Sequence, residues 1–266
     1  MRRSGMSVFR STRVTAVTSV LAAVLAGSAL YAAGAATADN SVPRSDKEIP
    51  NLTTVESKIK AYYGDTVTNG EHYASADSSY AHQLAGIEAK AHTYLEHKVR
   101  GHHGAAKPAI VLDVDDTTLL TYNYELEVGF NYTPASSDTY IRTRTMKPVF
   151  GMPKLVNWAA DHGITVFYVT GRPEAQRAPS AANLAAAGYK PAADATHFFL
   201  KNPANPPAYL PCGATCSTVG YKSGTRAHIE SLGYDIVANF GDQYSDLSGG
   251  HADKGFKLPN PMYYLP

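Results

Sequence analysis

The sequence predicts an α/β fold, a three-layer sandwich in which helices cover both faces of a mostly parallel central sheet. From Pro108 onward, short apolar runs alternate with amphipathic stretches of helical period, and each of these stretches ends near a glycine. Strand–helix–strand units at this spacing form right-handed crossovers, which place successive strands parallel in one sheet. With 266 residues, 44% of them hydrophobic, the chain can bury one such Rossmann-like core together with attachments.

The positions of the expected elements follow from these runs. Strands are expected at residues 109–112, 165–169, 196–200 and 236–240, with helices at 153–162, 174–187 and 223–232. Before the core, residues 51–107 are expected to form a helical extension. Its first helix is capped by Asn51 and ends at Gly64, with Leu52, Val55, Ile59 and Tyr62 on one face, and its second covers residues 78–99.

Two small cap inserts are expected within the core, which spans residues 108–266. The first, residues 122–149, is rich in tyrosine and carries Arg142 and Arg144. Its aromatic rings either stack on an aryl or nucleoside group of a ligand or pack the interior of a small cap, and packing is the commoner role. The second insert, residues 202–220, is rich in proline and is expected to form a rigid edge of a lid.

The second insert also holds the only two cysteines, Cys212 and Cys216. An isolated pair in an exported chain is typical of a disulfide. A metal site would need two more soft ligands nearby, and the neighbouring sequence has none.

The N-terminal residues 1–38 have the pattern of a removable export signal. Four arginines lie within the first 13 residues, an uncharged stretch follows, and Ala36-Thr37-Ala38 is a small-x-small cleavage signal. We therefore expect cleavage after Ala38, a flexible leader at residues 39–50, and a secreted protein without a stable membrane anchor. A retained anchor is the alternative, but the uncharged stretch is diluted by Gly, Ser, Thr and Ala. The Arg2-Arg3 pair leaves open whether export uses the general or the twin-arginine route.

The charge of the mature chain argues against one class of partner. Removing the four signal arginines from the 24 Lys and Arg residues leaves 20 against 23 Asp and Glu, a net charge of −3. The sequence has no basic run either. A nucleic-acid polymer is therefore not expected as a partner.

Polar residues follow the predicted strands. Asp113 and Asp115 come after the first strand, and carboxylates at this spacing point the same way and repel each other unless a cation or proton compensates. A calcium loop is excluded, because its required Gly and Glu positions hold Thr118 and Tyr124. Taken alone, an aspartate cluster could simply cap the strand. However, Thr170 and Gly171 at a predicted helix start, Lys222 before the next helix, and Asp242 and Asp246 after the last strand would meet at the same sheet edge.

These motifs resemble those of the haloacid dehalogenase-like hydrolases. Asp113-x-Asp115-x-Thr117 matches the first motif, Thr170 the second, Lys222 the third, and Asp242 with Asp246 the fourth. Within that superfamily, stretches such as Tyr221-Lys-Ser-Gly-Thr-Arg and Phe256-Lys-Leu-Pro-Asn-Pro-Met-Tyr-Tyr264 resemble secreted acid phosphatases of the class B or subfamily III type. These are related to plant acid phosphatases and vegetative storage proteins, and the resemblance runs from about Leu52 to the C-terminus. Pro179 is a departure, and it should kink or delay the helix after Thr170.

The resemblance implies a secreted, Mg²⁺-dependent phosphoric monoester hydrolase, an acid phosphatase that acts on small phosphomonoesters through an aspartyl-phosphate intermediate. A dehalogenase would lack the acid at Asp115, because halide leaves without a proton. A non-enzymatic storage or binding protein on the same fold is the alternative. The implied roles are nucleophile for Asp113, general acid and base for Asp115, phosphate binding for Asp113, Thr170, Gly171 and Lys222, and Mg²⁺ binding for Asp113, the Asp115 carbonyl, Asp242 and Asp246.

Overall fold

The computed structural model describes residues 50–101 and 104–266. The predicted export signal, and the predicted leader up to Pro50, lie outside the described residues. The chain divides into two units, Met1–Val55 and Glu56–Pro266, and the second carries the fold. Within the described ranges, no helix is long and apolar enough to cross a membrane.

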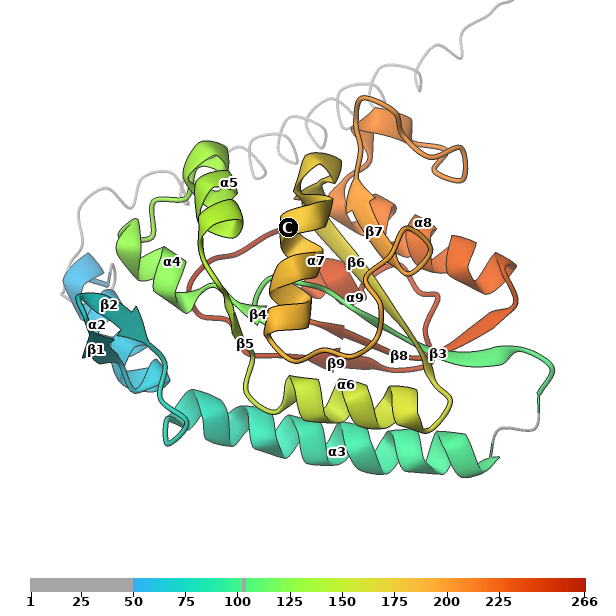
Figure 1. Cartoon of the computed structure of the whole chain (residues 1–266), viewed down its shortest axis with the longest axis horizontal. Helices are drawn as coiled ribbons and strands as arrows, with labels where there is room; N and C mark the ends of the chain where they lie inside the picture. The colour runs from blue at the N-terminus through green and yellow to red at the C-terminus, as the bar shows by residue number, and fades with distance from the viewer. Residues whose placement is uncertain (1–49, 102–103) are drawn as a thin grey trace, which may run out of the picture. The chain divides into compact units, whose positions relative to one another are not determined.

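The central sheet has five strands in the order β7-β6-β3-β8-β9, and every neighbouring pair is parallel (Figure 1). The predicted α/β fold with a mostly parallel sheet is thus confirmed. The edge strand β9 was not predicted, because it is only three residues long and buries a single side chain, Phe256. The strands are β3 (Lys107–Leu112), β6 (Thr165–Pro173), β7 (Phe198–Lys201), β8 (Tyr234–Gly241) and β9 (Gly255–Lys257).

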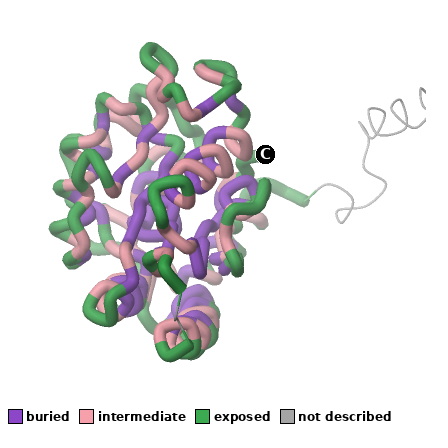
Figure 2. Tube along the Cα trace, turned by 90° about the vertical axis from the view of Figure 1, so that its right-hand side faces the viewer, coloured by how far each residue is buried: buried purple, intermediate pink, exposed green. Residues whose placement is uncertain are grey.

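Helices flank this sheet. On one face, Val111, Phe167 and Val169 form a core cluster with Tyr221 and Ile229 of α8 (Thr218–Ser231). The helices α3 (Ser79–Gly101) and α6 (Met152–Asp161) pack against each other, and α6 contacts β6 (Figure 1). Figure 2 shows the buried residues gathered along the central strands and the exposed residues on the surrounding helices and loops.

Two predicted helix starts are corrected. The helix α8 begins at Thr218 rather than at Ser223, because the Ser217 side chain accepts a hydrogen bond from the Gly220 N–H at 3.1 Å and caps it. Lys222 therefore lies inside α8 and not before it. The other helix begins with a 3₁₀ turn, η1 (Glu174–Gln176), and continues as α7 (Arg177–Ala186). Pro179 delays it as expected and lies in its first turn, where a missing N–H costs no hydrogen bond.

The N-terminal extension is helical as predicted, with one addition. Between α2 (Leu52–Tyr63) and α3, strands β1 (Thr66–Thr68) and β2 (Glu71–Tyr73) form an antiparallel hairpin. Its turn residues, Asn69 and Gly70, both have positive φ, as a tight two-residue hairpin turn requires. In α2 the buried tyrosine is Tyr63, which stacks on Tyr122, and not the predicted Tyr62.

Both inserts contain local structure. The first holds α4 (Tyr122–Glu127), α5 (Pro134–Thr143) and β5 (Lys147–Pro148), which pairs with β4 (Leu119–Leu120). Its Tyr122 and Tyr124 are buried and pack the interior, Phe130 and Tyr140 are half-buried, and Tyr132 is exposed. In the second insert, η2 (Gly213–Thr215) is closed by a disulfide between Cys212 and Cys216, with Cα atoms 4.9 Å apart.

Candidate active site

The neighbouring strands β3 and β8 end side by side and place the first carboxylates of the site. Leu112 pairs with Phe240, so Asp113 and Asp242 emerge at the same edge of the sheet. Next to Asp242, Gly241 is required by packing, because a Cβ at this position would lie 2.3 Å from the Cβ of Asp246. The absence of a side chain lets the short helix α9 (Tyr244–Leu247) fold back and bring Asp246 to the same place.

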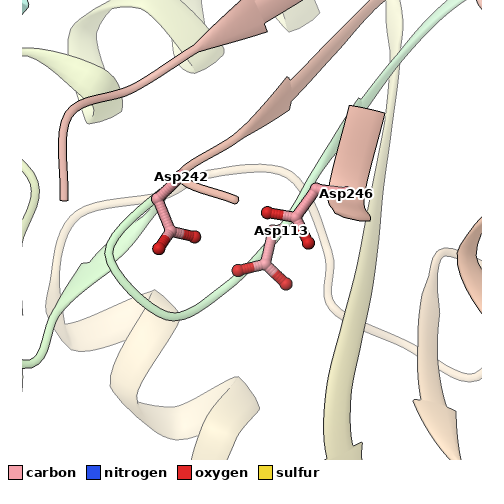
Figure 3. Close-up of side chains that lie close together, drawn as sticks. All are labelled: Asp113, Asp242 and Asp246. Carbon is pink, nitrogen blue, oxygen red and sulfur yellow. The ribbon is translucent and has the colours of Figure 1, made fainter. Parts of the chain in front are cut away.

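Three carboxylates converge here, those of Asp113, Asp242 and Asp246 (Figure 3). One oxygen from each lies within 4.8 Å of the others, and all three residues are buried. Burial, together with the neighbouring carboxylates, raises the pKa of Asp113 well above its usual range in spite of the Lys222 charge. Burial, followed by the charges of Asp116 and Asp246, raises the pKa of Asp242 to about 7. This set of hard oxygen donors fits a divalent cation.

Lys222 supplies the positive charge between two of these carboxylates. From α8 its Nζ donates to Asp113 Oδ1, and to Asp246 Oδ1 at 2.5 Å. Burial alone would lower the pKa of Lys222, but Asp113 and Asp246 raise it above its ordinary value, so the side chain stays protonated. Lys222 thus compensates one of the three negative charges.

Neutral amides orient Asp242. Its Oδ2 accepts hydrogen bonds from Gln243 Nε2 and from Asn260 Nδ2, both at 2.7 Å. The Gln243 backbone N–H donates to Asp246 Oδ2 at 2.9 Å and thereby closes a capping box at α9. Neither Gln243 nor Asn260 was predicted as a site residue. Two sequence features could have indicated them. Gln243 lies in the polar segment directly after the last predicted strand, and Asn260 is a single asparagine between two prolines near the C-terminus.

Asp115 lies apart from the three converging carboxylates and has a different partner. Its two carboxylate oxygens accept hydrogen bonds from Arg172 Nε at 3.0 Å and Nη2 at 2.6 Å. The third branch of the guanidinium, Nη1, donates to Ser180 Oγ at 2.8 Å. Arg172 is 5% exposed, and the Asp115 carboxyl is partly open to solvent. Arg172 was not predicted as a site residue, although it stands two residues after Thr170 on the same strand and therefore on the same face.

Thr170 and Gly171 occupy the strand next to β3. The buried Thr170 Oγ1 accepts a hydrogen bond from the Arg172 N–H at 3.2 Å, and Gly171 is exposed. Both residues lie within β6, which continues to Pro173. The expectation that they open a helix is therefore wrong, because the 3₁₀ turn begins only at Glu174.

A further buried aspartate, Asp116, lies close enough for its charge to act on Asp242. Its carboxylate accepts hydrogen bonds from the Thr121 N–H at 3.0 Å, the Thr121 hydroxyl at 2.5 Å and the Tyr263 hydroxyl at 2.7 Å. Burial raises the pKa of Asp116 to about 7 although these donors lower it. In the first insert, burial and then the charge of Asp115 raise the pKa of the buried Glu125 to about 7.

The fold and this constellation define a haloacid dehalogenase-like α/β protein. A family model for the HAD superfamily, subfamily IIIB (acid phosphatase), matches residues 22–266, so the chain belongs to that family. Among curated proteins, it is similar to acid phosphatase 1 of Solanum lycopersicum, with 33% identity over 162 residues, 58% of each chain. It is also similar to vegetative storage protein 1 of Arabidopsis thaliana, with 28% identity over 82% of this chain and 74% of the relative.

The stem 28 kDa glycoprotein of Glycine max is 31% identical over 164 residues, 60% of this chain. That match spans 61% of the glycoprotein's own length, less than two thirds. Among solved structures, the class C acid phosphatase from Bacillus anthracis matches with a TM-score of 0.59 and 21% identity, over 80% of this chain and 87% of the other. At that identity the likeness supports the fold.

Proposed function

We propose that the protein is a secreted, Mg²⁺-dependent acid phosphatase that hydrolyses small phosphomonoesters through an aspartyl-phosphate intermediate, an acyl phosphate on Asp113. The observation that carries this proposal is the convergence of three buried carboxylates, those of Asp113, Asp242 and Asp246, with one ammonium, that of Lys222, paired to two of them. Buried charges need compensation, and Lys222 balances one of the three. A divalent cation held by these residues would balance the other two and make the cluster neutral.

The residues that would hold the cation are Asp113, Asp242 and the backbone carbonyl of Asp115, with Asp246 completing or orienting the set. Mg²⁺ prefers a few protein oxygens together with water and a substrate phosphate. A carboxylate and a phosphate charge 4 Å apart repel each other by about 4 kcal/mol at an effective dielectric constant of 20. The bound ion would supply the charge that cancels this repulsion.

The protein's own residues then account for both halves of the reaction. A carboxylate oxygen of Asp113 attacks phosphorus, the bond between phosphorus and the ester oxygen breaks, and Asp115 gives a proton to the leaving oxygen. In the second half, Asp115 takes a proton from a water whose oxygen attacks phosphorus. This step releases inorganic phosphate and restores the Asp113 carboxylate. General acid and base catalysis of this kind contributes about 10²–10⁴ in rate.

Three further groups would hold the phosphoryl oxygens during transfer, the Thr170 hydroxyl, the Gly171 N–H and the Lys222 ammonium. Donors fixed in place before the reaction stabilise developing charge without reorganising. The ion pair with Arg172 supports the assignment of Asp115, because it fixes the direction of a carboxylate that is open to solvent on one side. The exposed Tyr132 in the first insert is available to contact the leaving group.

We also infer that the chain is exported, with residues 1–38 removed, and that the substrate is a small molecule and not a nucleic-acid polymer. The net charge of −3 after removal of the signal supports the second point. N-terminal sequencing of protein recovered outside the cells should begin at Asp39. A protein that starts at Met1 and remains in the membrane fraction would contradict cleavage.

The second candidate function is a storage protein without activity, because vegetative storage proteins are among the relatives. Asp113 and Asp242 at the converging strand ends, with Lys222 of α8 paired to Asp113, favour the enzyme. The deciding experiment assays the purified protein against aryl phosphates, nucleotides and sugar phosphates with Mg²⁺ and with chelator. Hydrolysis that Asp113→Asn abolishes supports the phosphatase, and no hydrolysis of any substrate with Mg²⁺ supports storage.

A further inference from the structure

Arg226 is the largest fully buried side chain among the described residues, and none of the proposed catalytic roles uses it. It lies on α8 four residues after Lys222, so both side chains project from the same face of the helix. Burial lowers the pKa of Arg226 to about 10, although the charge of Asp246 raises it. Burying a guanidinium costs free energy unless hydrogen bonds compensate. The groups that accept those hydrogen bonds therefore indicate the role of Arg226.

All three branches of the Arg226 guanidinium donate to backbone carbonyls of one loop. Nη1 donates to the carbonyl of Asp246 at 2.7 Å, Nη2 to that of Ser248 at 2.5 Å, and Nε to that of Gly250 at 2.9 Å. The Asp246 carbonyl accepts a second hydrogen bond, from Asn239 Nδ2 on β8 at 2.9 Å. The segment that ends α9 is therefore fixed through its main chain.

The same loop is also fitted closely to the surface of α8. A Cβ at Gly249, where φ is +86°, would lie 2.6 Å from the Cβ of Ser223. On the other side, Gly241 leaves just enough space for the Asp246 side chain. The helix α8 thus holds Asp246 twice, by its carboxylate through Lys222 and by its carbonyl through Arg226.

We propose that Arg226 is a positioning residue for the metal site: by fixing the main chain at Asp246, Ser248 and Gly250, it sets the place of the Asp246 carboxylate beside Asp113. Arg226 itself does not contact the ion or the substrate. This inference rests on the proposed function, because it assumes that the three carboxylates bind Mg²⁺. Outer groups that orient a metal ligand typically contribute 10–100-fold to metal affinity.

The test compares Mg²⁺ binding by isothermal titration calorimetry in the full chain and its variants. Arg226→Met removes all three donors and should weaken Mg²⁺ binding by about 10–100-fold. Arg226→Lys, with one donor atom in place of three, should give an intermediate dissociation constant. If Arg226→Met does not fold, Arg226→Lys alone still decides, because wild-type affinity in a folded variant would overturn the inference.

A double mutant separates positioning from general destabilisation. In an Asp246→Asn background, replacing Arg226 should change Mg²⁺ affinity little, because the carboxylate that it positions is already gone. Arg177→Met is the matched control. Arg177 also donates to main-chain carbonyls, those of Phe198 at 2.7 Å and Asp194 at 3.5 Å. Phe198 belongs to β7, the edge strand at the opposite end of the sheet from β9. It should lower the melting temperature without changing Mg²⁺ affinity.

The outcomes of the two proposals can be told apart. If wild-type protein binds no Mg²⁺, the proposed metal site and this inference both fail. If wild-type protein binds Mg²⁺ and Arg226→Met binds it equally well, only the role of Arg226 is refuted. An equal loss of affinity from Arg226→Met and Arg177→Met would also refute it, because the effect would then follow stability and not position.

Discussion

Arg172 and Asp115 form a bidentate ion pair, with Nε···Oδ2 and Nη2···Oδ1 distances of 3.0 and 2.6 Å. Because of this pair, the two aspartates of the first motif have different partners. Asp113 bonds to Lys222 inside the cluster, whereas Asp115 bonds to an arginine from the neighbouring strand. Two carboxylates that stand two residues apart thus have different electrostatic surroundings.

The first prediction divides the roles of these two aspartates. Asp113→Asn removes the attacking charge, so hydrolysis of every phosphomonoester should fall to background. Asp115→Asn removes the acid, so alkyl phosphates should lose more in phosphoryl transfer than aryl phosphates, whose phenolate leaves with less help. Single-turnover rates with both substrates measure the difference. Wild-type turnover in Asp113→Asn would refute the mechanism.

The second prediction concerns Arg172. Arg172→Met should lower kcat by about 10²-fold, because a displaced Asp115 no longer meets the leaving oxygen. The loss should be much smaller in an Asp115→Asn background, since Arg172 acts through that carboxylate. Arg142→Met, which removes an exposed arginine paired with Asp138, is the control and should keep full activity. Additive losses in the double mutant would show that Arg172 contacts the substrate independently.

The third prediction concerns the metal. Chelation should abolish turnover, and Mg²⁺ should restore it. Mg²⁺ at 100 times its dissociation constant should also raise the free energy of unfolding by about 2.7 kcal/mol, because only the folded chain brings the three carboxylates together. Asp242→Asn should remove most of this stabilisation, measured as a shift in melting temperature. Full activity in a metal-free preparation would contradict the proposal.

The fourth prediction is a pH dependence of stability from Glu88. This side chain on α3 lies against Gly151 at the start of α6, its Oε1 is buried without a partner among the described residues, and burial raises its pKa from 4.5 to about 7. Between these two values the native state binds more protons than the unfolded state. The contribution of Glu88 to the free energy of unfolding therefore falls as pH rises from 4.5 to about 7.

Urea unfolding of wild type and Glu88→Gln from pH 4 to 8 measures this contribution as a difference. The variant should become the more stable of the two above about pH 7. Glu96→Gln, at a glutamate on the same helix that pairs with Arg100 and His92, is the control and should show no such trend. A constant difference between wild type and Glu88→Gln across the range would contradict the assignment.

The fifth prediction concerns the disulfide. Mature protein should have no free thiol until it is reduced, which alkylation and mass spectrometry will measure. The loop between Cys212 and Cys216 is short, so its closure contributes about 2 kcal/mol at most, and the core should stay folded after reduction. Cys216 directly precedes the helix cap Ser217, so reduction should loosen the first turn of α8, seen as faster amide exchange there. Alkylation of both cysteines without reductant would refute the pairing.

The parts of the fold that could be predicted are those with a strong periodic signal. Strands β3, β6 and β8 are buried apolar runs, and their polar C-terminal residues indicated the site. The hairpin at Asn69-Gly70 could also have been predicted, because this dipeptide favours tight hairpin turns. The strand β9 carried almost no signal, because three residues with one buried side chain show no alternation.

The groups that orient the site were harder to predict than the groups that line it. Lys222 was identified, but its place inside α8 depends on Ser217 acting as a cap, and Ser223 was an equally eligible helix start. Arg226 and Asn260 lie in stretches that resemble acid phosphatases, but nothing in those stretches indicates which contacts the two side chains make. Their roles depend on contacts with residues that are distant in sequence, such as the hydrogen bond from Asn260 to Asp242.

The hydrogen bond from Tyr263 to Asp116 joins residues 147 positions apart, and it determines when the site is completed during synthesis. Together with the bond from Asn260 to Asp242, it makes the final turns of the chain part of the wall behind the reacting groups. A nascent chain halted before residue 260 would contain Asp113, the proposed nucleophile, but not its finished surroundings. Under the proposed function, activity would begin only once the C-terminal segment has docked, and a bulky group fused after Pro266 would interfere with that docking.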